Sequence, residues 1–238
     1  MALIAPLGVV FDMDDTLYLE RDYVRSGFRH VARSFANAAG VSAEALFDWL
    51  WTDFEAGGRG DTLDRLRAAF PGLQESVTTA EMVAAYREHA PSITPLAGVK
   101  ALLDSLEQRG VRLGLLSDGP LVCQRNKMAA LELGDRFQPA LLSDAWGREY
   151  WKPHERGYAQ FAAQWGLAPD RLIAIGDNPE KDFVTPRRLG WLTIRVRLSG
   201  QLRAALSPRS AEYAPHHEVF DLPSLERLLN DPIAVVST

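Results

Sequence analysis

The stretch Val9–Leu17, VVFDMDDTL, runs from three apolar residues directly into a cluster of carboxylates. A short β-branched and aromatic run of this kind is typical of a central parallel strand buried on both faces, and ligands in parallel sheets bind where the strands end. Side chains alternate along an extended chain, so Asp12 and Asp14 point the same way. Two acids this close need either a divalent cation or a shared proton. We therefore predict that Asp12 and Asp14 lie at the edge of a buried sheet and share one ion or substrate.

Two other structures are compatible with parts of this stretch. Aspartates after a strand often only cap the following helix, and that alternative stays open for an isolated Asp-x-Asp. In a calcium loop, Asp12, Asp14 and Thr16 would fall at ligand positions 1, 3 and 5. The loop fails at position 6, where Leu17 replaces glycine, and at position 12, where Tyr23 replaces glutamate.

The composition is that of an ordinary globular protein. The chain has 238 residues, of which 47% are hydrophobic and 24% charged, enough for one α/β domain with an insertion. The net charge of −5 comes from interspersed acids and bases, so we expect no nucleic-acid partner. Cys123 is the only cysteine, which excludes an intrachain disulfide and fits a reducing compartment. Without a signal-peptide pattern or a membrane-length apolar run, we expect a cytoplasmic monomer or homodimer with no membrane partner.

Residues 19–96 show helical periodicity without a convincing strand. The signals for four successive helices are, in order, an apolar stripe from Val24 to Ala39, a serine cap at Ser42, an aspartate cap at Asp61 for a helix through Phe70, and the capping-box sequence from Thr78 to Glu81 for a helix that ends before Pro91. We expect this segment to form a small helical bundle.

From Pro95 onward, strand and helix patterns alternate. The expected strands cover residues 112–116, 140–143, 172–175 and 192–196, with a last strand near Val219 before a final helix. Lys152-Pro153 is expected to open a helix that runs to about Trp165, because proline suits a first turn. This order predicts a Rossmann-like parallel sheet covered on both faces, formed by residues 1–18 and 97–238, with residues 19–96 inserted as a helical cap domain.

Unusual polar residues follow three of the expected strands. Asp12 and Asp14 follow the first, Ser117 the second and Asp177 the strand at 172–175, and Lys152 stands at an expected helix start. Each has an ordinary explanation when taken alone, as a turn residue, a helix cap or a surface lysine. An open parallel sheet gathers its strand ends in one crevice, so we expect these residues to be neighbours.

These residues, in this order, resemble the four signatures of the haloacid dehalogenase superfamily of phosphotransferases. The signatures correspond here to Asp12-x-Asp14-x-Thr16, to Ser117, to Lys152, and to Gly176-Asp177 followed by Asp182. The match extends from residue 7 to about residue 196, and the helical insertion resembles that family's cap domain of the first type. The dehalogenases of the family lack the second aspartate of the first signature, so Asp14 indicates phosphoryl transfer.

The resemblance implies a mechanism and a metal. Asp12 would attack phosphorus and form an aspartyl-phosphate intermediate. Asp14 would protonate the leaving oxygen and then activate water, and we expect the crowding of acids around it to raise its pKa. Magnesium would be held by the side chains of Asp12 and Asp177 and by the main-chain carbonyl of Asp14, with Asp182 orienting these ligands.

The resemblance also implies a phosphate-binding set. Ser117, together with the backbone N–H groups of Asp118 and Gly119, would hold the phosphoryl oxygens, and Lys152 would add a fixed positive charge. Lys181, next to Asp182, is an alternative to Lys152, although its place suits an exposed helix start.

The function predicted from these residues is a magnesium-dependent phosphatase acting on a small phosphomonoester, such as a sugar phosphate or a nucleotide. A cap over the crevice favours a small phosphorylated metabolite as its partner. Arg59, in the Gly57–Gly60 loop, is a candidate for gripping the leaving group, and a solvated loop arginine is the alternative. A phosphosugar mutase and a non-catalytic module that binds a phosphorylated ligand are the competing functions.

Overall fold

A six-stranded parallel sheet forms the centre of the computed structural model, which describes residues 3–4, 7–230 and 233–234. Its strands lie in the order β4-β3-β2-β5-β6-β7, and all neighbours are parallel. Their bounds are β2 Gly8–Phe11, β3 Arg112–Ser117, β4 Ala140–Leu142, β5 Leu172–Gly176, β6 Leu192–Val196 and β7 His217–Val219. The predicted α/β class with a Rossmann-like sheet is confirmed. Two short strands, β1 Leu3–Ile4 and β8 Ile233–Ala234, pair separately and antiparallel.

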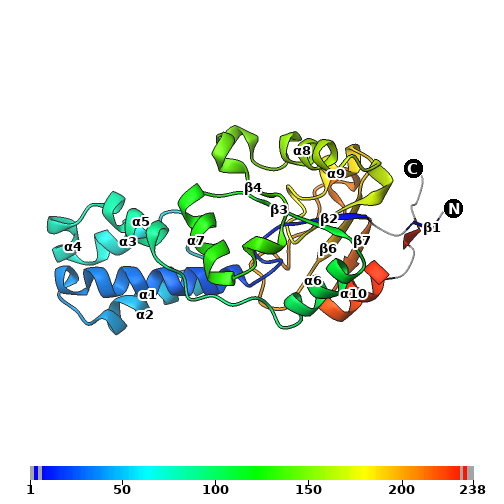
Figure 1. Cartoon of the computed structure of the whole chain (residues 1–238). Coiled ribbons are helices and arrows are strands. Elements are labelled where there is room, and N and C mark those ends of the chain that lie inside the picture. Colours follow the sequence, from blue (N-terminus) through cyan, green and yellow to red (C-terminus); the bar gives the residue numbers. More distant parts are fainter. Residues whose placement is uncertain (1–2, 5–6, 231–232, 235–238) are drawn as a thin grey trace.

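Helices cover both faces of this sheet (Figure 1). The helices α6 Val99–Gln108, α7 Leu121–Leu131 and α10 Leu222–Asn230 pack on one face, and α8 Arg156–Trp165 and α9 Val184–Arg188 lie on the other. Val9 and Phe11 of β2 share an apolar cluster with Leu103 of α6, whereas Val10 packs with Phe161 of α8. Alternate residues of β2 thus reach opposite cores, and each fully buried side chain of this size contributes about 1.5–3 kcal/mol.

The central strands end side by side. Phe11 lies opposite Leu115 of β3 and Ile175 of β5, and the N–H of Asp12 donates to the Ile175 carbonyl at 2.8 Å. The residues that follow these positions include Asp12 and, in the next strands, Ser117 and Asp177. Parallel register therefore brings residues that are 105 and 165 positions from Asp12 in the sequence (117 − 12 and 177 − 12) to one edge of the sheet.

Five helices fill the segment after β2 and form a lobe beside the sheet (Figure 1). They are α1 Glu20–Ala39, α2 Ala43–Glu55, α3 Thr62–Ala69, α4 Pro71–Ser76 and α5 Thr79–Glu88. Their apolar faces share a cluster of their own, which includes Val31, Leu50 and Met82. The caps at Ser42 and at Thr78 with Glu81 are confirmed. The division into a core of residues 1–18 and 97–238 and a cap of residues 19–96 stays a prediction.

Three details differ from expectation. The helix expected from Asp61 through Phe70 ends at Ala69 and is followed by α4, and the Asp61 side chain pairs with Arg65 instead of capping the helix. The helix expected at Lys152-Pro153 begins only at Arg156, and the N–H of Lys152 donates to the Asp118 carboxylate at 3.1 Å. Short 3₁₀ turns cover Gly134–Arg136, Ser143–Trp146, Arg148–Tyr150, Pro169–Arg171 and Ala211–Tyr213. None of the described helices is long and apolar enough to cross a bilayer.

Candidate active site

A cavity of about 440 Å³ lies where the strand ends of the sheet meet the helical lobe. Asp12, Asp177 and Lys152 line it from the side of the sheet, and Tyr23 of α1 and Arg87 of α5 line it from the lobe. The structure thus brings the acids after β2 and β5 together with a lysine from a distant loop. A ligand here would contact the strand ends and the lobe at once.

Asp12 is almost completely buried at this edge. The Lys152 ammonium donates to its Oδ1 at 2.5 Å, and its Oδ2 has no hydrogen-bond partner among the described residues. Burial raises the pKa of Asp12 to about 6, because the nearby Lys152 charge only partly offsets the loss of hydration and the Asp182 charge adds to the rise. One oxygen of Asp12 is therefore held in place while the other is free to react or to bind a cation.

Lys152 is an internal cation rather than a surface lysine. It is 7% exposed, and its ammonium contacts Asp12 and the Oδ1 of Asp182, the latter at 2.8 Å. Burial would lower its pKa, but the carboxylates of Asp12, Asp182 and Asp118 outweigh burial and raise the pKa well above the ordinary value. The charge at this position is therefore fixed at physiological pH.

Asp177 and Asp182 complete a group of three buried carboxylates with Asp12. One oxygen from each lies within 4.8 Å of the others. Burial, together with the charges of Asp182 and Asp12, raises the pKa of Asp177 well above its ordinary value. A Cβ on Gly176 would lie 2.5 Å from the Asp182 carboxylate, so only glycine leaves room for this approach. Phe183, not Asp177, is the residue that precedes α9, so a mere capping role for Asp177 is excluded.

This group fits a hard divalent cation. The Oδ2 atoms of Asp12 and Asp177 are buried and have no hydrogen-bond partner within the described ranges. The single contacting lysine leaves an excess of negative charge on these buried carboxylates. Mg²⁺ prefers carboxylate oxygens and would satisfy both oxygens and the charge.

The Asp14 carboxylate is not part of this group, although it lines the same cavity. It accepts from the Lys127 ammonium at 2.7 Å, from Gln124 Nε2 at 3.0 Å and from the Tyr18 hydroxyl. Burial would raise its pKa, but these three donors, with Lys127 first among them, outweigh burial and lower the pKa of Asp14 to about 2. The expectation of a raised pKa was wrong, because it counted the neighbouring acids and missed the lysine.

The turn after β3 is held by the Asp118 side chain. Its carboxylate accepts from Ser143 Oγ at 2.7 Å, from the Lys152 N–H at 3.1 Å and from the Lys181 ammonium at 3.0 Å. Asp118 and Gly119 line the cavity, whereas Ser117 is fully buried behind them with its Oγ unpartnered among the described residues. Asp118 therefore joins the turn after β3 to the loop that carries Lys152.

Lys181 also lies in the cavity, although the sequence suggested an exposed position. Lys152 and Lys181 are thus not alternatives, since both face the site. Arg59 is elsewhere: it donates to the carbonyls of Phe54 at 2.8 Å and Gly58 at 2.6 Å, and its guanidinium lies 4.0 Å from the Phe54 ring. The cavity lining does not include it.

Three further residues that shape the site were not identified from the sequence. Lys127 and Gln124 are three positions apart on α7, and this helical spacing was the available signal. The Asp15 carboxylate accepts hydrogen bonds from the N–H groups of Glu20 at 2.8 Å and Leu202 at 2.7 Å. These bonds connect the turn after β2 to the start of α1 and to the segment after β6. Burial raises the pKa of Asp15 to about 7.

A family model described as a haloacid dehalogenase-like hydrolase matches residues 7–190. The glyceraldehyde 3-phosphate phosphatase of Methanopyrus kandleri is 27% identical over 220 residues, covering 89% of this chain and 92% of the relative. The phosphoserine phosphatase of Thermus thermophilus is 31% identical over 123 residues, covering 52% of this chain and 46% of the relative.

Solved structures share the fold. The putative hydrolase YfnB of Bacillus subtilis, solved with bound magnesium, aligns with a TM-score of 0.65 at 18% identity and covers 95% of this chain and 100% of its own. The L-2-haloacid dehalogenase of Xanthobacter autotrophicus aligns with a TM-score of 0.57 at 22% identity, covering 94% of this chain and 98% of its own. At these identities the likeness concerns the fold.

Proposed function

The chain belongs to the haloacid dehalogenase-like hydrolases, and from this membership we propose that it is a magnesium-dependent phosphatase that hydrolyses a small phosphomonoester through an aspartyl-phosphate intermediate. The observation that carries the proposal is Asp12, a buried carboxylate with one oxygen fixed by Lys152 and the other unpartnered among the described residues, at the floor of a cavity. A carboxylate so placed is a nucleophile ready for in-line attack.

In the first step, the Asp12 carboxylate attacks phosphorus. A bond forms between an Asp12 oxygen and phosphorus as the bond from phosphorus to the ester oxygen breaks, and the alcohol leaves with a proton from Asp14. Lys127 lowers the pKa of Asp14, so Asp14 does not hold a proton while this contact is present. Asp14 must therefore leave Lys127 and contact the substrate before it can donate that proton. With its pKa lowered to about 2 by these contacts, we infer that Asp14 is ionised at neutral pH before substrate binds.

In the second step, water cleaves the aspartyl phosphate. Ionised Asp14 takes a proton from the attacking water, the phosphorus–Asp12 bond breaks, and inorganic phosphate leaves with both carboxyl groups restored. The low pKa keeps the Asp14 carboxylate ionised at neutral pH, and loss of the Lys127 contact would increase its basicity.

The remaining residues of the site would bind the cation and the phosphoryl oxygens of the substrate. Asp12 and Asp177, with the main-chain carbonyl of Asp14, would hold Mg²⁺, which when bound would neutralise the repulsion between an anionic nucleophile and an anionic substrate. Lys152 would face the phosphoryl oxygens, and the N–H groups of Asp118 and Gly119, with the Ser117 hydroxyl, would complete their cradle. Asp182 would orient Lys152 through its 2.8 Å contact.

The cavity favours a small substrate. Its volume of about 440 Å³ suits a phosphorylated metabolite such as a sugar phosphate or a nucleotide, and the relatives are named for glyceraldehyde 3-phosphate and for phosphoserine. We expect phosphate release from at least one such ester in a panel of phosphorylated metabolites with Mg²⁺, and its loss in EDTA. A phosphoenzyme that passes its group to a second sugar instead of water would indicate a mutase. The absence of any turnover across the panel, with phosphorylated ligands still bound, would favour a non-catalytic binding module.

Arg87 is the candidate for contact with the leaving group, in place of Arg59. It lines the cavity from the last turn of α5, and no ion pair to it occurs within the described part of the chain. The other cavity cations all contact carboxylates, as Lys127 does with Asp14. An unpaired arginine at this position suits an anionic group, such as a carboxylate, on the leaving alcohol.

We expect Arg87→Gln to raise KM roughly tenfold for 3-phosphoglycerate, because one charge-assisted contact is lost, while kcat stays near the wild-type value. Steady-state phosphate release with 3-phosphoglycerate and p-nitrophenyl phosphate measures this. The artificial ester, which has no carboxylate, should be almost unaffected, and Arg59→Gln is the matched control that should change neither. If Arg87→Gln impairs both esters equally, recognition of the leaving group is rejected.

A further inference from the structure

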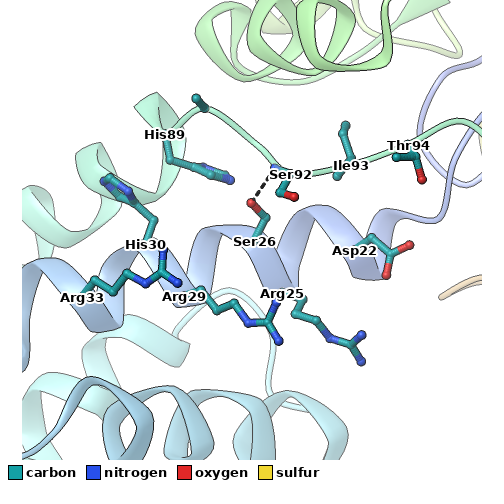
Figure 2. Close-up of a pocket in the computed structure, with 11 residues that line it drawn as sticks. Asp22, Arg25, Ser26, Arg29, His30, Arg33, His89, Ser92, Ile93 and Thr94 are labelled. Carbon is teal, nitrogen blue, oxygen red and sulfur yellow. Dashed lines mark hydrogen bonds between the residues drawn. The ribbon is translucent and has the colours of Figure 1, made fainter.

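A second hollow, of about 520 Å³, lies along α1 on the side of the lobe where residues 89–94 return to the sheet (Figure 2). Arg25, Arg29 and Arg33 of α1 line it, together with His30 and the return segment. Among the residues that line the active-site cavity, none also lines this groove. We call it the arginine groove.

The three arginines repeat every four residues and therefore lie in a row on one face of α1. Figure 2 shows their side chains following one another along the helix. Within the ranges that the structure describes, no carboxylate forms an ion pair with them, whereas Arg21, one turn earlier, pairs with Glu55 at 2.7 Å. Like charges at this spacing repel, and this row occurs in a chain whose net charge is −5. A bound anion would relieve that repulsion.

Two of these guanidinium groups are held in place by aromatic rings of α2. The guanidinium of Arg25 lies 4.5 Å from the centre of the Trp51 ring, and that of Arg29 lies 5.2 Å from the Phe47 ring. Stacking on an aromatic face leaves the N–H edge of a guanidinium free for oxygen acceptors. Because the side chains are already ordered, binding an anion costs less conformational entropy.

The opposite wall, residues 89–94, contributes no carboxylate to the lining. Ser26 Oγ accepts from the N–H of Ser92 at 2.8 Å, which ties the return segment to α1. His30 stacks on His89, a residue that is 3% exposed and whose Nε2 has no hydrogen-bond partner among the described residues. Asp22 is the acid in the lining, and Figure 2 shows it at the far end of the row from Arg33. Glu44 and Asp48 line a neighbouring hollow together with Arg29 and Arg33, but neither acid forms an ion pair with these arginines among the described residues.

From this geometry we propose that the arginine groove binds a small phosphate-type oxyanion with two or more negative charges. Arginine forks bind phosphate oxygens in pairs, and three of them in a row suit linked phosphate groups better than a single one. The volume of about 520 Å³ leaves room for such a ligand. The proposal does not depend on hydrolytic activity.

Titration calorimetry of the full chain with sodium pyrophosphate, in EDTA and at constant ionic strength, tests the site. We expect Arg29→Gln/Arg33→Gln to weaken one binding event at least roughly tenfold per arginine removed. Turnover of p-nitrophenyl phosphate should be unchanged in this variant. Arg125→Gln, an exposed α7 arginine outside both cavities, is the matched control and should bind as the wild type does.

Three results would overturn the proposal. Unchanged pyrophosphate binding in the double variant would place the ligand elsewhere, and equal weakening in Arg125→Gln would indicate only a loss of overall charge. Equally tight binding of an oligoglutamate peptide by the wild type would show that the groove selects acidic side chains and not phosphate groups. Binding that persists in the double variant at wild-type strength belongs to the active site, where Lys152 and Lys181 offer the other cations.

Discussion

Asp12→Asn is expected to reduce turnover by roughly 10⁴-fold or more, because an amide oxygen does not displace an alcohol from phosphorus. The fold should survive. Asparagine has the shape of aspartate, and its oxygen can still accept from the Lys152 ammonium that now lies 2.5 Å away. The substitution also removes one charge from a buried group of three acids, so we expect the variant to unfold at the same temperature as the wild type or higher.

Phosphate release and acid-quench trapping of phosphoenzyme measure this effect. The matched control is Asp14→Asn, which keeps the nucleophile and loses the proton-transfer group. With p-nitrophenyl phosphate, whose leaving group needs little protonation, Asp14→Asn should still form phosphoenzyme but hydrolyse it slowly. Asp12→Asn should form none. Appreciable phosphoenzyme in Asp12→Asn would reject Asp12 as the nucleophile.

The sheet and its reactive edge could be predicted because both follow from local pattern. The apolar run at Val9–Phe11 has the length and residue types of a strand buried on both faces, and Figure 1 shows β2 in the middle of the sheet. Parallel register then places Asp12, Ser117 and Asp177 at one edge, whatever the details of the connecting helices. Lys152 was identified through the family resemblance, and its contacts with Asp12 and Asp182 agree with its expected place.

The orientation of the second aspartate could not be predicted from the same pattern. The alternation of side chains along a strand predicts the side on which Asp14 lies but not the residue that its carboxylate contacts. That residue is Lys127, 113 positions away, and it determines both the orientation and the pKa of the Asp14 carboxylate. Asp15 likewise depends on the N–H of Leu202, 187 residues away. The spacing of Gln124 and Lys127 shows that they share a helix face, but tertiary packing decides that this face meets Asp14.

The lobe shows the same limit. The glycines around Arg59 suggested a tight backbone path from which the arginine could reach the crevice, yet the nearby Phe54 ring and two carbonyls hold the guanidinium locally. The helix at Pro71–Ser76 was missed, although proline at a first helical position is a recognised start signal. Aromatic capture of an arginine depends on a neighbour's side-chain orientation, which the spacing of residues 54 and 59 does not determine.

Removing the metal is the second change for which we expect a large effect. Three carboxylates lie within 4.8 Å of one another with one contacting lysine, so the site without a cation carries uncompensated buried charge. We expect EDTA to reduce turnover by roughly 10²-fold or more, since repulsion between Asp12 and an anionic substrate would be restored. Added Mg²⁺ at a hundred times its Kd should contribute about 2.7 kcal/mol of stability.

Scanning calorimetry separates this metal site from a general salt effect. For a chain of this size the stabilisation corresponds to a rise in Tm of about 5–10 °C. Asp177→Asn should lose most of this rise, while Asp170→Asn, an exposed acid, should keep it. Equal rises in wild type and Asp177→Asn, or an equal rise with NaCl, would reject the site.

The pH dependence of the metal-free protein gives an independent check of the same carboxylates. Burial and the charges of Asp182 and Asp12 raise the pKa of Asp177 in the folded state. The contribution of Asp177 to the free energy of unfolding is therefore present in full below the pKa it has in the unfolded chain, and it is lost as the pH rises through the pKa it has in the folded protein. In EDTA, the wild type should therefore lose stability relative to Asp177→Asn as the pH rises toward neutrality. Mg²⁺ should reverse that order, because the cation favours the ionised carboxylate that only the wild type has. A single buried acid that destabilises the empty site and stabilises the filled one is what a metal ligand requires, and a purely structural aspartate would not change sign.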